Sequence, residues 1–80
     1  MIRLVFLGRL ADLAGSGELA LEADATISLA AILARLTPTL AAALGEGRIK
    51  CAVNGALVPH KGLFVAPGDE LAFLPPVSGG

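Results

Sequence analysis

Apolar and polar residues alternate along three stretches of the chain, the pattern of a β-strand with one buried face. The stretches cover residues 2–7, 18–23 and 48–53. The alternation predicts inward side chains at Ile2, Leu4 and Phe6 in the first stretch, Leu19 and Leu21 in the second, and Ile49, Cys51 and Val53 in the third. A last strand is expected over residues 70–74, ended by Pro75-Pro76, because neither proline can donate to a strand ladder.

Between the second and third predicted strands, the spacing of the apolar residues is that of a helix. Asp24-Ala25-Thr26 is the expected start, with Thr26 as N-cap. Apolar residues then follow at i, i+3, i+4 and i+7, namely Leu29, Ile32, Leu33 and Leu36. Pro38 is expected to stop this helix, and residues 39–44 predict a shorter one. The segment 8–17 is ambiguous, although Leu10, Leu13 and Ala14 have helical spacing.

Asn54-Gly55 is the strongest hairpin signal in the chain and predicts a short strand over residues 56–58. A loop is expected from Pro59 to Asp69. The order of elements favours an α+β roll, with a mixed sheet packed on one main helix. The β-grasp, or ubiquitin-like, arrangement is the economical solution, with the first and last strands parallel at the centre of the sheet.

Composition narrows the class of protein. The chain has 80 residues, of which 55% are hydrophobic and 16% charged, with a formal net charge of −1. One domain spanning residues 1–80 is therefore expected, and nucleic acid is not an expected partner because there is no basic excess. No apolar run approaches the ~20 residues of a membrane span, and no signal-peptide layout is present. One cysteine permits no internal disulfide, so a cytoplasmic location is expected.

The side chains offer no catalytic set. His60 is expected to be a solvated loop residue, and Cys51 a small core residue rather than a nucleophile. Asp69 and Glu70 are interpreted as a solvated turn rather than an acid/base pair. Gly8, Gly15 and Gly17 form no phosphate-binding fingerprint. We therefore expect no bound metal or cofactor, and no catalysis by this chain alone.

The C-terminal Gly79-Gly80 is the feature to which chemistry can be assigned. It can be a frayed end, as in many small domains. Without Cβ atoms, however, it is thin enough to thread a narrow channel, and its carboxylate is unshielded. Joined to AMP, that carboxylate becomes a mixed anhydride that a sulfur nucleophile can displace. We expect residues 75–80 to form a flexible tail, aimed outward by Pro75-Pro76.

A docking surface is predicted on the sheet face opposite the helix. The first strand shows Arg3, Val5 and Leu7 there. The central strands add Arg48, Lys50, Ala52 and Leu74, and Leu57 is a further candidate. An exposed apolar patch with basic residues at its edge is more often a protein-binding surface than an accident of composition. The alternative is that apolar residues are exposed only because the chain is rich in Ala and Leu.

Three segments carry a resemblance to a known family. They are Val5-Phe6-Leu7-Gly8-Arg9-Leu10-Ala11-Asp12-Leu13-Ala14-Gly15, Cys51-Ala52-Val53-Asn54-Gly55, and Pro67 to Gly80 with its ending Phe73-Leu74-Pro75-Pro76-Val77-Ser78-Gly79-Gly80. Over its whole length the chain resembles the MoaD small subunits of molybdopterin synthase, within the MoaD/ThiS group of ubiquitin-like sulfur carriers.

The resemblance implies a two-stage sulfur cycle. A ubiquitin-activating-type adenylating enzyme would use ATP and magnesium to adenylate Gly80, and a persulfide donor would convert it to a thiocarboxylate. The tail, with Gly79, would then enter the large catalytic subunit of molybdopterin synthase, in an expected heterotetramer, and give sulfur to cyclic pyranopterin monophosphate. This chain would be the sulfur-donating subunit of a sulfurtransferase. Its expected partner-binding residues are Leu7, Leu57, Leu74, Arg3, Lys50, Pro75, Pro76, Val77 and Ser78.

Three alternatives stay open at this point. The chain can be the carrier of another pathway, such as thiamin synthesis. It can be a modifier conjugated to lysines through Gly80, as ubiquitin is. It can also be a plain β-grasp interaction domain with an inert tail.

Overall fold

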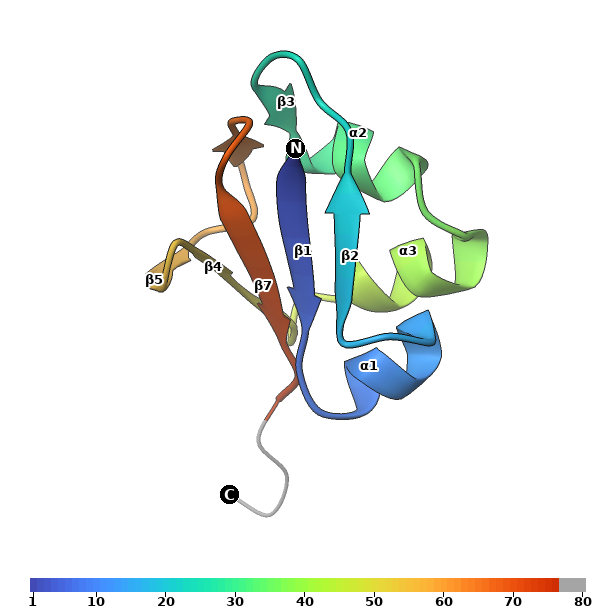
Figure 1. The fold of residues 1–80 in the computed structure, drawn as a ribbon. Coiled ribbons are helices and arrows are strands. Elements are labelled where there is room, and N and C mark those ends of the chain that lie inside the picture. Colours follow the sequence, from blue (N-terminus) through green and yellow to red (C-terminus); the bar gives the residue numbers. More distant parts are fainter. Residues whose placement is uncertain (77–80) are drawn as a thin grey trace.

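A five-stranded mixed sheet runs through the computed structural model, which describes residues 1–76 of the chain (Figure 1). The elements in chain order are β1 (Ile2–Phe6), α1 (Arg9–Ala14), β2 (Glu18–Leu21), β3 (Ile27–Ser28), α2 (Leu29–Ala34), α3 (Pro38–Leu44), β4 (Lys50–Val53), β5 (Ala56–Val58), β6 (Phe64–Val65) and β7 (Glu70–Leu74). The sheet order is β2-β1-β7-β4-β5, and β3 and β6 pair separately. The first and last strands are parallel neighbours at the centre, which confirms the predicted β-grasp topology.

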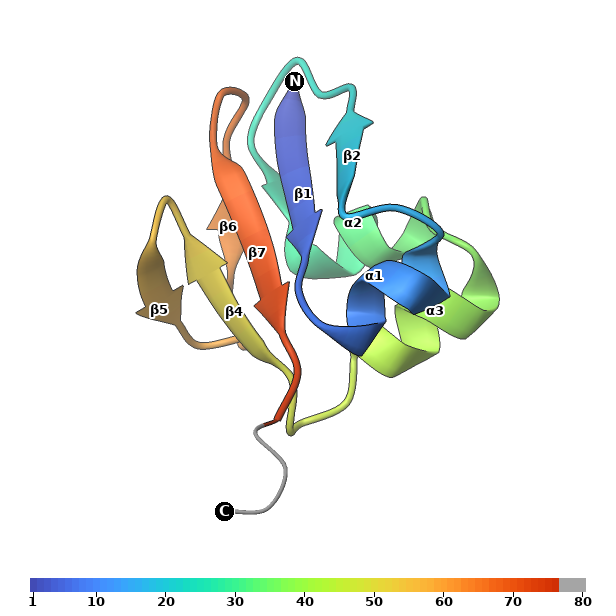
Figure 2. The ribbon, with the colours of Figure 1, turned by 60° about the horizontal axis from the view of Figure 1, so that its bottom comes forward.

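The core lies between the sheet and the helices. Alternate residues of β1, namely Ile2, Leu4 and Phe6, are buried as predicted, and Leu71 and Phe73 of β7 lie beside Leu4 and Phe6 in the register. The rings of Phe6 and Phe73 stack with centroids 5.8 Å apart. All three helices lie on one side of the sheet, so its other face is left open (Figures 1 and 2).

The main helix begins later than predicted. Residues Ile27 and Ser28 are extended and pair with Val65 and Phe64, so the N-cap is Ser28 and not Thr26. The Ser28 hydroxyl accepts a hydrogen bond from Ala31 N–H at 3.1 Å. The prediction was wrong here because strand pairing with β6, a long-range contact, holds the two residues out of the helix.

The same pairing explains a missed strand. Residues 59–69 were expected to form a loop, whereas Phe64–Val65 is β6. Pro38 also has a different place from the one expected: it is the first residue of α3, whose N-cap is Thr37. A proline is tolerated there because the first N–H groups of a helix have no intrahelical partner.

Two burial predictions were wrong. Leu19 pairs with buried Leu4 and so faces the helix side, but it is 41% exposed because β2 is an edge strand with only one neighbour. Ala52 faces the open side and yet is buried, because Ala72 and Leu57 flank it on the neighbouring strands. Burial at these positions depends on the residues of the adjacent strands. The alternation within one strand does not show which residues those are.

The predicted Asn54-Gly55 hairpin is confirmed. Both residues have positive φ, 50° and 86°, as a two-residue type I′ turn requires. The Asn54 side chain also ties the turn to the start of β7. Its Nδ2 donates to Asp69 Oδ1 at 3.0 Å, and its Oδ1 accepts from Glu70 N–H at 2.9 Å.

Candidate functional site

The site is built around the point where the last strand leaves the sheet. β7 runs through the middle of the sheet and carries the chain out at the end where β1 turns into α1 (Figure 1). The β1–β7 pairing continues one step past β1, because Leu7 N–H donates to Phe73 O at 3.1 Å. Leu74 is therefore the last strand residue before Pro75-Pro76.

Gly8 makes room for the first proline. Its φ is +57°, and a Cβ added to it would lie 3.1 Å from Pro75 Cγ. A larger residue would push on the proline ring and would also strain the backbone. Pro75 and Pro76 are both half-buried, so the body of the domain supports the base of the tail. This contact was not foreseen, although Gly8 stands directly after a strand in the sequence.

The remaining tail residues named in the sequence analysis, Val77, Ser78, Gly79 and Gly80, lie outside the described residues. Their proposed roles in partner binding, adenylation and thiocarboxylate formation stay predictions.

The open face of the sheet carries a row of small apolar side chains. Register places Val5 beside Ala72, Ala72 beside Ala52, and Ala52 beside Leu57, across β1, β7, β4 and β5. Leu57 is 69% exposed. Ala72 lies at the centre of this row, and the sequence analysis missed it. Its position two residues from Leu74 in an alternating strand was the available signal.

Leu7 and Leu74 lie at the end of this face where the tail leaves. Leu7 is 42% exposed and Leu74 is half-buried. Lys50 pairs with Leu74 in the register and is exposed. Arg48 is also exposed, but it precedes β4 and lines a pocket with Arg9 and Leu13 of α1. Leu7, Leu74 and Lys50 of the predicted patch thus lie together at the base of the tail. The role of this surface in docking stays a prediction.

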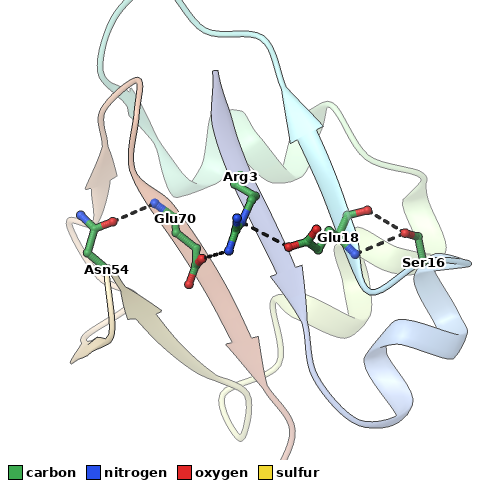
Figure 3. A network of polar contacts seen from close by, with 5 residues as sticks. All are labelled: Arg3, Ser16, Glu18, Asn54 and Glu70. Atoms are coloured by element: carbon green, nitrogen blue, oxygen red, sulfur yellow. Dashed lines mark hydrogen bonds and ion pairs between the residues drawn. The ribbon is translucent and has the colours of Figure 1, made fainter.

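Arg3 lies on the same face at the opposite end. It is held between two carboxylates: Nε is 3.3 Å from Glu18 Oε1, and the guanidinium also pairs with Glu70 (Figure 3). Ser16 supports this arrangement through hydrogen bonds with the Glu18 backbone. The charge of Arg3 is therefore already matched by two carboxylates, whereas Lys50 forms no ion pair with any residue from 1 to 76.

The two side chains with nucleophilic or basic potential lie elsewhere. Cys51 is 1% exposed in the core, and burial raises the pKa of its thiol to about 11, so the thiol is neutral near pH 7. His60 is half-buried rather than solvated, and its Nε2 is enclosed without a hydrogen-bond partner among the described residues. The turn closed by Leu63 N–H and His60 O folds this loop back on the domain.

Within residues 1–76 no group of three His, Cys, Asp or Glu side chains is arranged to hold a metal ion. Over the same residues no helix is long and apolar enough to cross a membrane. The features of the described chain that chemistry can use are the base of the tail and the open apolar face.

Comparison with known proteins now identifies the family. The model of the ThiS family matches residues 4–80. The chain belongs to the ThiS family. The match takes in nearly the whole chain, including the C-terminal Gly-Gly, so the family resemblance seen in the sequence is confirmed.

Individual members of this group are similar along their full length. The molybdopterin synthase sulfur carrier subunit of Haemophilus influenzae is 35% identical, with 100% of both chains covered. The crystal structure of SAMP1 from Haloferax volcanii has a TM-score of 0.77 at 31% identity, covering 99% of this chain and 98% of that one. A Helicobacter pylori protein, solved as the complex of subunits 1 and 2 of molybdopterin-converting factor, has a TM-score of 0.65 at 25% identity, covering 99% and 97%.

Proposed function

We propose that this chain is the sulfur carrier subunit of molybdopterin synthase. The observation that carries the proposal is the full-length similarity to the Haemophilus influenzae subunit of that name. The geometry supports it, because central strand β7 ends at Leu74 beside the open apolar face, and Pro75-Pro76 lead the chain out from there. A carrier of this kind needs a reactive end and a docking surface close together.

The proposed chemistry takes place on the Gly80 carboxylate. On an adenylating enzyme of the ubiquitin-activating type, this carboxylate attacks the α-phosphate of Mg-ATP. The reaction forms the acyl-adenylate and releases pyrophosphate. Sulfur from a persulfide donor then displaces AMP, and reduction of the resulting sulfur–sulfur bond by a thiol leaves the thiocarboxylate. Cys51 is not the sulfur donor, since its thiol is buried and neutral.

The proposed acceptor is cyclic pyranopterin monophosphate, held by the large subunit in a heterotetramer. The Helicobacter pylori complex of two subunits supports a large-subunit partner for this chain. We place the reaction in the cytoplasm, where the charged carrier and its partners meet. In this scheme the large subunit catalyses the transfer, and this chain supplies the sulfur.

Charging is tested first. With Mg-ATP, an adenylating enzyme, a persulfide donor and a thiol reductant, the intact mass should rise by about 16 Da as oxygen is replaced by sulfur. A variant lacking Gly80 should show no gain. The proposal fails if the truncated chain is charged as well as the full chain.

A second candidate function is conjugation to lysines. The similarity to two structures from Haloferax volcanii, SAMP1 and small archaeal modifier protein 1, favours testing it. A sample of the thiocarboxylate form is therefore divided between two reactions. One contains the large subunit and the pterin precursor, and the other contains lysine-bearing proteins. Sulfur loss with return of the original mass supports the carrier function. Isopeptide adducts without sulfur transfer to the precursor would support the modifier function instead.

A further inference from the structure

A pocket of about 280 Å³ opens beside the point where the last strand leaves the sheet. Its apolar wall contains Leu10 and Leu13 of α1 and Ile49, the residue before β4. Leu10 and Ile49 are buried core residues, whereas Leu13 is 46% exposed. Pockets that bind small molecules usually have about 300–1,000 Å³. This pocket is at the small end of that range, so it suits one large apolar side chain better than a cofactor.

The residues beside the apolar wall are charged. Arg9 is the first residue of α1, and Glu46 and Arg48 lie between α3 and β4. All three are exposed, and none of them forms an ion pair with another residue from 1 to 76. Two positive charges against one negative charge attract a carboxylate, and a second acidic group would meet the like charge of Glu46. The pocket is therefore complementary to one apolar side chain with a single carboxylate next to it.

The position of the pocket connects it with the docking surface already described. Helices α1 and α3 pack on the helix side of the sheet, so the pocket lies on the side away from the open face (Figure 2). Pro76 is part of its wall, and Leu74, only two residues earlier, lies on the open face. A protein that covers Leu74 at the base of the tail can therefore cover the pocket as well. Among the proposed partners, the large subunit is the one that a similar solved complex supports.

We infer that this pocket receives one large apolar side chain of the large subunit, with an adjacent Asp or Glu that pairs with Arg9 and Arg48. The inference rests on the proposed function for the identity of the partner, and on the pocket for the chemistry of the contact. The apolar side chain supplies most of the binding energy, because residues anchored in pockets dominate protein interfaces. The exposed ion pairs contribute less and mainly select the segment that is accepted.

The apolar contact is tested by calorimetric titration of the full chain with the purified large subunit. Leu13→Ser should weaken binding about tenfold, the effect of losing an anchored contact. Leu19→Ser is the matched control, because Leu19 is 41% exposed and is not part of the pocket. Its affinity should equal that of the unaltered chain. Thermal melting of both variants confirms that they are folded.

The charges are tested in the same titration. Arg48→Gln should weaken binding about two- to fivefold, the range of an exposed ion pair. Glu46→Gln should strengthen binding by a similar factor, because it removes the negative charge beside the incoming carboxylate. Lys61→Gln, which removes an exposed charge outside the pocket, should have no effect. Damage to the fold would weaken binding in every variant, so the opposite signs identify charge complementarity.

A cross-link identifies the chemical group on the partner. Arg48→Lys keeps the positive charge and provides an amine that a carbodiimide can join to a carboxylate in contact with it. An amide bond forms, and the carboxylate oxygen leaves with the carbodiimide as a urea. Mass spectrometry should find position 48 joined to an Asp or Glu of the large subunit.

The outcomes separate this inference from the proposed function. If the unaltered chain binds the large subunit and Leu13→Ser and Arg48→Gln bind equally well, the inference is overturned and the proposed function stands. If the unaltered chain does not bind the large subunit, both are overturned. A dimer of the chain alone that Leu13→Ser abolishes would assign the pocket to a second copy and would also overturn the inference.

Discussion

Gly8 shows how a single residue determines where the tail begins. Its φ is positive, and a Cβ added to it would lie 3.1 Å from Pro75 Cγ. A side chain at this position would therefore crowd the proline ring that follows β7. The functional role of this glycine is geometric, because it permits the Pro75 contact at the base of the tail.

Gly8→Ala should destabilise the domain. Gly8 combines φ of 57° with ψ of −138°, a sparsely populated conformation for an alanine that costs about 1–3 kcal/mol, and the contact with Pro75 adds to this cost. Gly17→Ala is the matched control, since no atom lies within 4 Å of the added Cβ and φ there is not positive. Equal melting temperatures of the two variants would show that the Gly8 conformation is not required.

Cys51→Ala should leave sulfur transfer intact. The thiol is buried and its pKa is raised to about 11, so it is neither accessible nor ionised. The cost should be limited to packing, about 1 kcal/mol in the free energy of unfolding. Mass spectrometry of the charging reaction and urea denaturation measure the two effects. A folded variant that no longer accepts sulfur would reveal a catalytic thiol.

At the scale of elements, the hairpin between β4 and β5 is held to β7 by polar contacts. Asn54 bonds both Asp69 and the backbone of Glu70, and Asp69 Oδ2 accepts from Ala66 N–H at 2.9 Å. These contacts join two turns that are far apart in the chain. They keep β4 and β7 in the register that assembles the open face.

Asn54→Ala should be more harmful than Asn54→Gly. Both changes remove the two side-chain hydrogen bonds, each contributing roughly 0.5–1.5 kcal/mol. Only alanine also carries the cost of positive φ, so the difference between the variants isolates the turn conformation. Denaturant titration of the three proteins gives this order. Equal stability of the two variants would mean that the turn relaxes to negative φ.

The Asp69 contacts also predict acid sensitivity. Hydrogen bonds from Asn54 and Ala66 N–H hold the pKa of the Asp69 carboxyl below its usual value. The unfolded chain therefore takes up the proton first as pH falls, and the stabilisation present at neutral pH is lost as pH falls through the lowered pKa. In Asp69→Asn this loss should be absent. Unfolding measured from neutral pH into the acid range tests this, with Asp24→Asn, an exposed aspartate, as control.

At the scale of the whole molecule, the sheet separates two tasks. One face packs against the helices and supplies stability, and the other stays open beside the tail. Phe73 and Leu74 are neighbours in the chain and lie on opposite faces of β7. They offer a direct comparison of folding with docking.

Leu74→Glu should fold and bind the large subunit poorly, because the new carboxylate would have to be desolvated in an apolar contact. A loss of about 2 kcal/mol, roughly thirtyfold in affinity, is expected for a central interface residue. Leu7→Glu should behave in the same way. Phe73→Glu should unfold the domain, since Phe73 is 0% exposed. Thermal melting beside a calorimetric titration distinguishes these results, and normal binding by folded Leu74→Glu would place the docking surface elsewhere.

The sequence alone was sufficient for much of this molecule. The alternation in β1 and β4 predicted their buried faces, Asn54-Gly55 predicted its hairpin, and the element order predicted a parallel central pair. These features follow from the periodicity of apolar residues and from turn residues, and both can be read from residues that are close in the sequence. The Gly-Gly end and its family resemblance were equally readable.

Tertiary structure decided the rest, because those features depend on residues far apart in the chain. Pairing of Ile27 with Val65 delayed the main helix, and the edge position of β2 left Leu19 exposed. Glu18 and Glu70, from different strands, matched the charge of Arg3. The contact of Gly8 with Pro75 spans nearly the whole chain. No pattern along the sequence reports such contacts, since they exist only once the sheet has brought its strands together.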